Sequence, residues 1–344
     1  MKRRREAGAW RSEISLSHNE IAALRFLSGQ GVTVAPQVIA SDDTAGIVVM
    51  EDLGSGPSLE DVLFDHDSRA ATAALVAFGT ALGEMHAATA GADGEYYRHR
   101  RILGPVHADA ERLGVLERSI DSCWMILQSI VTERPELPPL PANVNKEIAD
   151  INEILLEPGP WLVLSNGDPC PANTRLADGT IRFLDFEHAS YHHALLDLTS
   201  LHLPFPACPC WSLMPQGVSI KAIAAYRNSF AKRYPPVLDD DIYYPQLAAN
   251  CMIWAMQRLT RLPKLDAFDE PHPVGFSRRG QLLSTIEAAV NVARRAGSCP
   301  QLANWLADMS DTLETRWSKA PMIRPFFPAF ATPRRELANV RGGS

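Results

Sequence analysis

The chain has little of several features that mark particular classes of protein. Its six cysteines in 344 residues are too few and too scattered for a disulfide framework, so we expect buried or loop thiols in a reducing, cytoplasmic setting. No uninterrupted apolar run approaches the ~18 residues of a membrane helix, and no signal-peptide core follows the basic residues at 2–5. The net charge of −7 argues against a general nucleic-acid binder, which needs a basic face. We therefore expect a soluble protein that binds neither membranes nor nucleic acids.

The composition is that of a globular chain with a sizeable core, 46% hydrophobic and 21% charged, and its length predicts two structural units, or one large unit with a small satellite. Short β-rich runs next to polar turns predict strands at 38–40, 47–50, 161–164, 175–176 and 181–184, with hairpins across 38–50 and 175–184. Apolar residues at helical spacing predict helices over 18–29, 59–64, 70–86, 112–131, 145–156, 219–233, 241–261, 277–295 and 300–317. The predicted fold class is α+β, with helices dominating after residue 54.

The most informative residues follow two of the predicted strands. Asp168 and Asn173 lie five positions apart in a loop stiffened by two prolines, and Asp185 follows the next strand, 12 residues after Asn173. Magnesium prefers carboxylate and amide oxygens, and phosphoryl transfer needs a separate carboxylate to orient the attacking hydroxyl. Asp168 therefore suits the base, and Asn173 and Asp185 suit the metal ligands. The competing interpretation, a loop aspartate that only forms a turn before proline, does not account for Asp185 at this spacing.

The order of motifs resembles one family. Asn-Gly-Asp-Pro-Cys-Pro-Ala-Asn at 166–173, followed by Phe-Leu-Asp-Phe-Glu and Leu-Leu-Asp-Leu, is similar to the aminoglycoside phosphotransferase and choline kinase-like family, whose members share the protein kinase-like fold. Segments 19–27, 48–53 and 82–86 resemble its ion-pairing helix, its hinge and its Leu-Gly-x-Leu-His motif. The resemblance covers about residues 1–205 and implies two lobes: a truncated N-terminal β lobe with the hinge at 1–53, and a large, mostly helical lobe at 54–344 that carries the catalytic loop and acceptor site.

The resemblance assigns roles to individual residues. It implies that Asp168 is the catalytic base, that Asn173 and Asp185 bind Mg²⁺, and that Glu20 pairs with the phosphate-binding lysine. Asn166 and Asp197 would support the catalytic loop, Asp197 by anchoring it from the following helix. The hinge, whose backbone groups would bind the base of ATP or GTP, would consist of Met50, Glu51, Asp52 and Leu53.

The N-terminal part departs from the family pattern. No glycine-rich loop precedes Glu20, and Lys2, 18 residues before it, is the candidate lysine, with Arg3–Arg5 as rival cations. We expect the missing strands of the family either to precede Met1, with the start misassigned, or to be absent from a truly truncated protein. Without backbone donors from that loop the phosphates would sit in a wetter site, where charge interactions are weaker.

Three further groups of residues have both a chemical and a plainer interpretation. The histidines and cysteines at 188, 192, 193, 202, 208 and 210 match no familiar zinc spacing, so we expect thiols and histidines without a metal. The Asp239–Asp241 run suits a helix N-terminus better than a site for a polycationic acceptor. Segment 205–211, rigid and aromatic, is a candidate wall of the acceptor pocket, whereas the tryptophans at 254, 305 and 317 are expected in the core.

The sequence thus predicts an ATP- and Mg²⁺-dependent phosphotransferase that moves the γ-phosphoryl group to a hydroxyl of a small molecule, such as an aminoglycoside-like antibiotic, a sugar or an amino alcohol. The alternative is a nucleotide-binding pseudoenzyme that lacks the phosphate-binding loop. A protein kinase is less favoured, because only 11 residues separate Asp185 from Asp197 and leave no room for an extended activation segment.

Overall fold

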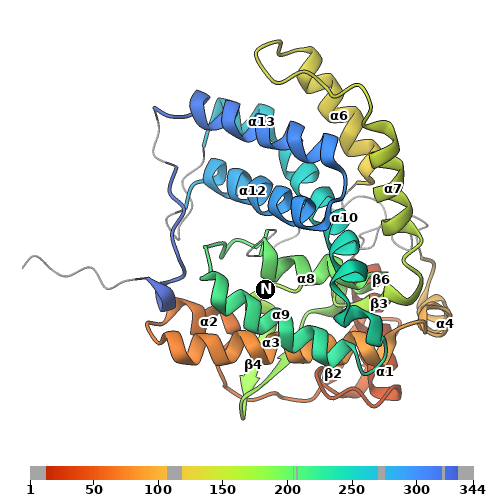
Figure 1. Cartoon of the computed structure of the whole chain (residues 1–344). Coiled ribbons are helices and arrows are strands. Elements are labelled where there is room, and N and C mark those ends of the chain that lie inside the picture. Colours follow the sequence, from red (N-terminus) through yellow and green to blue (C-terminus); the bar gives the residue numbers. More distant parts are fainter. Residues whose placement is uncertain are drawn as a thin grey trace, which may run out of the picture.

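The computed structural model describes residues 13–106, 118–203, 205–206, 208–269, 276–319 and 322–331. In these ranges the chain passes from one helix and a β-hairpin into a mainly helical body (Figure 1). The helices are α1 (Glu13–Gly29), α2 (Leu59–Phe64), α3 (Ser68–Thr89), α4 (Asp93–Leu103), α6 (Ile120–Thr132), α7 (Asn145–Leu156), α8 (Ala194–His202), α9 (Gln216–Phe230), α10 (Asp240–Leu259), α11 (Leu262–Ala267), α12 (Arg278–Ala296) and α13 (Pro300–Arg316). Short 3-10 turns are η1 (Gly159–Trp161), η2 (Pro171–Asn173), η3 (Phe186–His188), η4 (Pro235–Leu238) and η5 (Pro328–Phe330).

The strands form small antiparallel pairs, β1 with β2, β3 with β6, and β4 with β5. Their bounds are β1 (Val38–Asp42), β2 (Ile47–Met50), β3 (Leu162–Ser165), β4 (Thr174–Ala177), β5 (Thr180–Phe183) and β6 (Ser190–His193). The β4–β5 turn is the predicted Asp-Gly step: Asp178 and Gly179 both have positive φ, as the tightest hairpin turns require. Both predicted hairpins are confirmed, and the α+β class follows from the observed elements.

The helical body is built on close helix–helix contacts. Helix α3 packs along α9 with glycine at the contact, because a Cβ on Gly79 or Gly83 would collide with the α9 backbone. Helix α10 packs against α12, and α12 against α13, in the upper part of Figure 1. The tryptophans at 254, 305 and 317 are buried, as expected for core residues. None of the described helices combines the length and apolarity needed to cross a bilayer.

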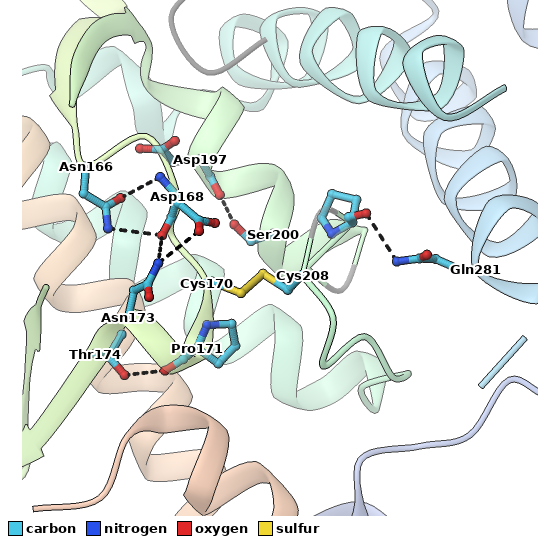
Figure 2. Close-up of a disulfide and its surroundings, with 11 residues drawn as sticks. Asn166, Asp168, Cys170, Pro171, Asn173, Thr174, Asp197, Ser200, Cys208 and Gln281 are labelled. Atoms are coloured by element: carbon cyan, nitrogen blue, oxygen red, sulfur yellow. Dashed lines mark hydrogen bonds between the residues drawn. A yellow bond between two sulfur atoms is a disulfide. The ribbon is translucent and has the colours of Figure 1, made fainter. Parts of the chain in front are cut away.

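Several predicted bounds and one expectation need correction. Helix α4 and strand β6 were not predicted, and α6 begins at Ile120 within the predicted helix at 112–131, of which residues 112–117 lie outside the described ranges. The expectation of free thiols is wrong for Cys170 and Cys208, which form a disulfide (Figure 2). These residues are 38 positions apart, and only the packing of the loop after β3 against the segment after α8 brings their Cα atoms to 5.8 Å. Free thiols remain at 123, 210, 251 and 299.

Candidate active site

The loop that joins β3 to η2 is organised by the side chain of Asn166. Its Nδ2 donates to the backbone carbonyls of Asp168 and Leu184, both at 3.2 Å, and its Oδ1 accepts from the Asp168 amide at 3.3 Å (Figure 2). Leu184 directly precedes Asp185, so this one buried amide connects the loop of Asp168 to the chain that carries Asp185. An amide can do this because it offers donors and an acceptor at once.

Asn173 faces Asp168 across the same loop. Its Nδ2 donates both to the Asp168 carbonyl and to the Oδ2 of the Asp168 carboxylate, each at 3.0 Å (Figure 2). The Asn173 backbone is held at both ends, by donation to the Cys170 carbonyl at 2.9 Å and by acceptance from the Leu184 amide at 2.9 Å. With the nitrogen committed to Asp168, the side-chain oxygen of Asn173 is the atom suited to a metal ion.

Asp185 lies between β5 and η3 in the left-handed conformation, with φ 63° and ψ 65°. Aspartate adopts this region more readily than most residues, because its short polar side chain is tolerated there. Gly167 also has positive φ, and a Cβ at that position would overlap the carbonyl of His188, just after Asp185. The loop of Asp168 and the turn after Asp185 are therefore in direct backbone contact.

The negative charges of neighbouring carboxylates act together on Asp168. Burial raises the pKa of Asp168 above its usual value, the hydrogen bond from Asn173 opposes that rise, and the charges of Asp185, Asp197 and Glu187 add to it. Accumulated negative charge in a partly buried site favours a divalent cation. The donors are hard oxygens, a carboxylate from Asp185 and an amide oxygen from Asn173, so they fit Mg²⁺.

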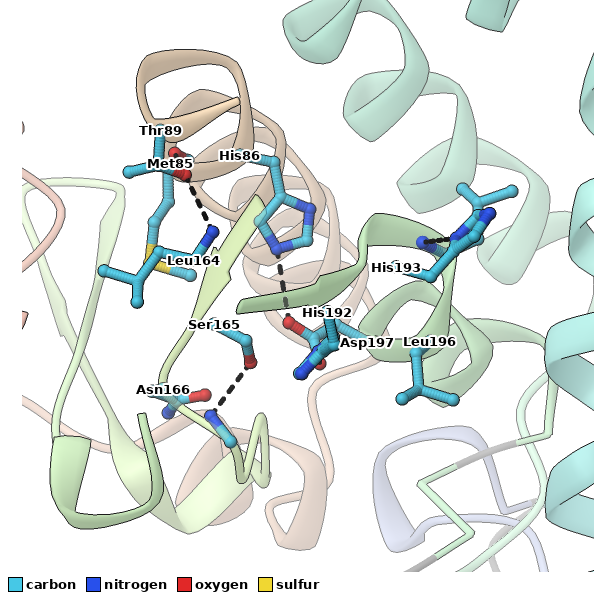
Figure 3. Close-up of polar contacts among 12 residues, drawn as sticks. Met85, His86, Thr89, Leu164, Ser165, Asn166, His192, His193, Leu196 and Asp197 are labelled. Carbon is cyan, nitrogen blue, oxygen red and sulfur yellow. Dashed lines mark hydrogen bonds and ion pairs between the residues drawn. The ribbon is translucent and has the colours of Figure 1, made fainter. Parts of the chain in front are cut away.

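Asp197 on α8 is buried between two histidines (Figure 3). Its carboxylate accepts from His86 of α3 at 3.2 Å and from His192 of β6 at 2.9 Å. Burial alone would raise the pKa of Asp197. The electrostatic attraction of His192 and His86 and the hydrogen bonds that they donate outweigh the effect of burial and hold this pKa below its usual range. Burial lowers the pKa of His86, so its Nε2–H donates to Asp197 while its Nδ1 accepts from the Tyr226 hydroxyl at 3.0 Å.

The anchoring predicted for Asp197 thus takes a different form. Its side chain joins α3 to β6, and β6 pairs with β3, the strand that leads into the loop of Asp168. Each carboxylate oxygen of Asp197 pairs with one histidine, so the connection to the loop that these contacts describe runs through β6 and β3.

Helix α1 meets the segment after Asp185 through Asn19. The Asn19 Nδ2 donates to the Glu187 carbonyl at 3.0 Å, and its Oδ1 accepts from the buried Arg100 of α4 at 2.6 Å. Sequence reasoning missed Arg100, because α4 lacked a clear apolar stripe. Glu20, next to Asn19, is half-buried on the same helix. Its predicted partner Lys2 lies outside the described residues.

The hinge segment begins at the end of β2, where Met50 pairs with Val38 of β1. Asp52 follows, and its Oδ1 accepts from the amide of Gly54 at 2.8 Å, which turns the chain towards α2. The Asp52 side chain is thus engaged with the backbone two residues further along the chain.

Glu51 is held through both its backbone amide and its side chain. Its amide donates to the Gln37 carbonyl at 2.8 Å, and its carboxylate forms a two-point ion pair with Arg182 of β5 at 2.6 and 2.7 Å. The hydrogen bonds from Arg182, followed by that from the Gln37 amide, lower the pKa of Glu51 to about 2. The Glu51 amide is therefore already engaged by the Gln37 carbonyl.

The sequence profile of the phosphotransferase enzyme family matches residues 3–237, a span that contains Asp168, Asn173, Asp185 and Asp197. The chain belongs to this phosphotransferase family. The resemblance drawn from the motifs is thereby confirmed, and family membership makes the chain an enzyme that transfers phosphoryl groups.

Among solved structures, this phosphotransferase is similar to a choline/ethanolamine kinase family protein from Mesorhizobium loti, with 16% identity, coverage of 86% and 83% of the two chains, and a TM-score of 0.45. It is also similar to a choline kinase from Cryptosporidium parvum Iowa II, with 15% identity, coverage of 86% and 78%, and a TM-score of 0.41. A third is the amicoumacin kinase hAmiN in complex with AMP-PNP, Ca²⁺ and Ami, with 16% identity, coverage of 92% and 81%, and a TM-score of 0.42. No curated protein matches the chain.

Two further histidines of this phosphotransferase, His193 and His202, have core partners. His193 Nδ1 accepts from the Leu195 amide at 3.1 Å, and His202 Nε2 lies 3.0 Å from the Tyr243 hydroxyl. Burial lowers the pKa of His193 to about 4 and that of His202 to about 3, so both are neutral at physiological pH. At the N-terminus of α10, Asp239 accepts from the Asp241 amide at 2.9 Å, which confirms the capping interpretation.

Segment 205–211 carries Cys208, which the Cys170–Cys208 disulfide joins to the loop of Asp168 in this phosphotransferase. Phe205 and Trp211 are fully buried, so these aromatic rings belong to the core. The connection between this segment and the loop could not be predicted from spacing.

Proposed function

We propose that the chain is an ATP- and Mg²⁺-dependent kinase that moves the γ-phosphoryl group to a hydroxyl of a small molecule. The supporting observation is the Asn173–Asp168 pair: one amide orients the carboxylate of Asp168 and directs its own oxygen to the side suited to a metal ion. Family membership supplies the reaction class, and the oxygen donors supply the metal chemistry.

In this proposal Asp168 accepts the proton of the acceptor hydroxyl through its carboxylate, while Asn173 holds that carboxylate in orientation. Asn173 and Asp185 would hold Mg²⁺, which when bound neutralises charge on the phosphate oxygens. The Glu51 carbonyl and Leu53 amide would bind the base of ATP or GTP, and Lys2 with Glu20 would steady the phosphates. Most of the acceleration then comes from positioning and charge compensation.

We also propose the two-lobe, protein kinase-like organisation of the family, with a partial N-terminal lobe at 1–53 and the helical lobe at 54–344. The hinge between them would be Met50–Leu53, fastened to β5 by the Glu51–Arg182 ion pair. The acceptor would enter beside segment 205–211, which the Cys170–Cys208 disulfide holds against the catalytic loop.

The test compares Asp185→Asn with Asp178→Asn. Both aspartates have positive φ, and asparagine tolerates that conformation. The two variants therefore differ in the position of the replaced aspartate and not in backbone strain. Calorimetry should show Mg²⁺-dependent ATP binding to the wild type, weakened at least about tenfold, or about 1.4 kcal/mol, in Asp185→Asn and unchanged in Asp178→Asn. ADP formation against a panel of hydroxyl acceptors should follow the same order. Equal Mg²⁺-dependent binding by both variants would refute the metal assignment, and binding without any turnover would favour the pseudoenzyme.

A further inference from the structure

Three cysteines converge beside the catalytic loop. The sulfur atoms of Cys170, Cys208 and Cys210 all lie within 4.8 Å of one another, and all three residues are buried. Among the described residues, no other group of three or more histidine, cysteine or carboxylate ligands converges in this way. Cys170 and Cys208 form a disulfide (Figure 2), and Cys210 is a free thiol.

A disulfide needs two sulfur atoms, so it does not explain the third. The other buried free thiols, Cys123 on α6 and Cys251 on α10, lie on helices outside this group. A cluster of three thiols in one place is instead the usual ligand set of a soft cation.

Two of the three cysteines are held by turns of the backbone. The Cys170 amide donates to the Asp168 carbonyl at 2.7 Å, and the Cys208 amide donates to the Phe205 carbonyl at 3.1 Å, so each cysteine lies in a tight turn. Prolines flank Cys170 on both sides, and another proline separates Cys208 from Cys210. Ligands on such turns are held in place before a cation binds, which lowers the entropic cost of binding.

The charge around the cluster also suits a cation. Burial raises the pKa of the Cys210 thiol, and the negative charges of Glu60 and Asp168 raise it further. Two carboxylates are thus near enough to impose a negative potential on the sulfur cluster. A divalent cation bound there would be attracted by these carboxylates as well as by the thiolates.

We propose that in the reduced protein Cys170, Cys208 and Cys210 form a three-thiolate site for a soft divalent cation of the zinc class, separate from the oxygen donors of Asn173 and Asp185. Zinc binds thiolate sulfur at about 2.3 Å in tetrahedral geometry, which puts its sulfur ligands about 3.8 Å apart. Once the disulfide is reduced, the three sulfur atoms reach that spacing by small side-chain movements. Water or a neighbouring carboxylate completes the fourth position.

Zinc loading begins with reduction of the disulfide. A dithiol reductant gives two electrons and two protons to the Cys170–Cys208 disulfide and is itself oxidised to a disulfide, which leaves three thiols in the cluster. The three thiols then release three protons as their thiolates bind one Zn²⁺. In the oxidised protein two of the three sulfur atoms are bonded to each other, so the cation has no site. In either state, segment 205–211 stays fastened to the loop of Asp168.

The test measures metal content and needs neither nucleotide nor acceptor, so it is independent of the proposed kinase activity. The full chain is reduced with a dithiol, dialysed against Zn²⁺ without oxygen, freed of excess metal and analysed by elemental mass spectrometry. We expect one zinc per chain in the wild type and in the control Cys251→Ser, which removes another buried thiol. Cys210→Ser should bind zinc at least about tenfold more weakly, and disulfide-oxidised wild type should bind none.

A second measurement does not depend on how the variants fold. X-ray absorption at the zinc edge of the reduced wild type counts the ligands directly, and we expect three sulfur atoms at about 2.3 Å. Replacement of zinc by Co²⁺ should give the near-ultraviolet absorption of cobalt–thiolate bonds. Failure of the reduced wild type to retain zinc, a zinc ion with fewer than three sulfur ligands, or equal affinity in Cys210→Ser would overturn the proposal.

Discussion

The side-chain nitrogen of Asn173 donates to the Asp168 carboxylate at 3.0 Å and to the Asp168 carbonyl at the same distance. The two residues are five positions apart, and the η2 turn that ends at Asn173 curls the chain so that they face each other. One amide thereby fixes the orientation of the carboxylate and leaves its own oxygen for a metal ion. We therefore expect activity to depend on this arrangement of Asn173 and Asp168.

Asp168→Asn should lower kcat by about 10² to 10⁴, the contribution typical of a general base, while Mg²⁺-dependent ATP binding stays within twofold of the wild type. The asparagine keeps the shape of the side chain but accepts no proton. Steady-state kinetics and calorimetry on the same preparation measure the two effects. Asp311→Asn, at an exposed position on α13, is the control and should behave as wild type. A kcat unchanged in Asp168→Asn would remove this residue from the reaction.

The pH dependence of kcat/KM should show the raised pKa of Asp168. The reaction needs the carboxylate, so activity is lost as pH falls through that pKa, above the value near 3.9 of an ordinary aspartate. The residual activity of Asp168→Asn should lack this acid limb. An identical limb in both proteins would assign it to another group.

The raised pKa of Asp168 also affects the stability of the folded protein. Because the folded-state pKa of Asp168 lies above its unfolded value, the ionised carboxylate destabilises the folded protein at neutral pH, and the cost disappears as pH falls. Asp168→Asn should therefore be at least as stable as wild type at pH 7 in urea unfolding. A clear loss of stability would mean that the carboxylate is stabilised by contacts other than those with Asn173.

Gly167→Ala should be more damaging than Gly91→Ala, although both glycines have positive φ, of 78° and 76°. At Gly91 a Cβ meets no atom within 4 Å, so only backbone strain of about 1 to 2 kcal/mol is expected. At Gly167 a Cβ also collides with the His188 carbonyl, which must move and pull the loop away from Asp185. Urea unfolding and kcat measure the two consequences. Equal losses at both positions would show that the contact between the loop and η3 is not tight.

Asp197→Asn should cost about 3 kcal/mol of unfolding free energy at pH 7, because it removes the charged partner of two buried histidines. The folded-state pKa of Asp197 is depressed, so its stabilisation is complete above the unfolded value near 3.9 and is lost as pH falls towards the folded value. The difference between variant and wild type should therefore shrink below about pH 4. A constant difference down to pH 2 would mean that lost packing, not charge, causes the effect.

Local signals in the sequence predicted much of the molecule. The helix at 145–156 has the predicted bounds, the Asp178–Gly179 step makes the predicted hairpin, and Asp239 caps α10. Each depends on hydrogen bonds or side-chain spacing within a few residues, which a sequence displays directly. Helix α4 was missed because its polar residues give only a weak apolar stripe, and the buried Arg100 was missed with it.

The sequence by itself determined the phosphotransferase family and, with it, the reaction class, and it placed the candidate site residues Asp168, Asn173 and Asp185 in one short stretch in which two turns bring them together. Only the tertiary structure decided the contacts between distant segments. His86 reaches Asp197 across 111 residues, and Cys170 reaches Cys208 across 38, because β3 packs against both α3 and α8 and because the chain after α8 returns to the loop of Asp168. Such pairings follow from which faces are buried together, and that is a property of the whole packed chain rather than of any segment.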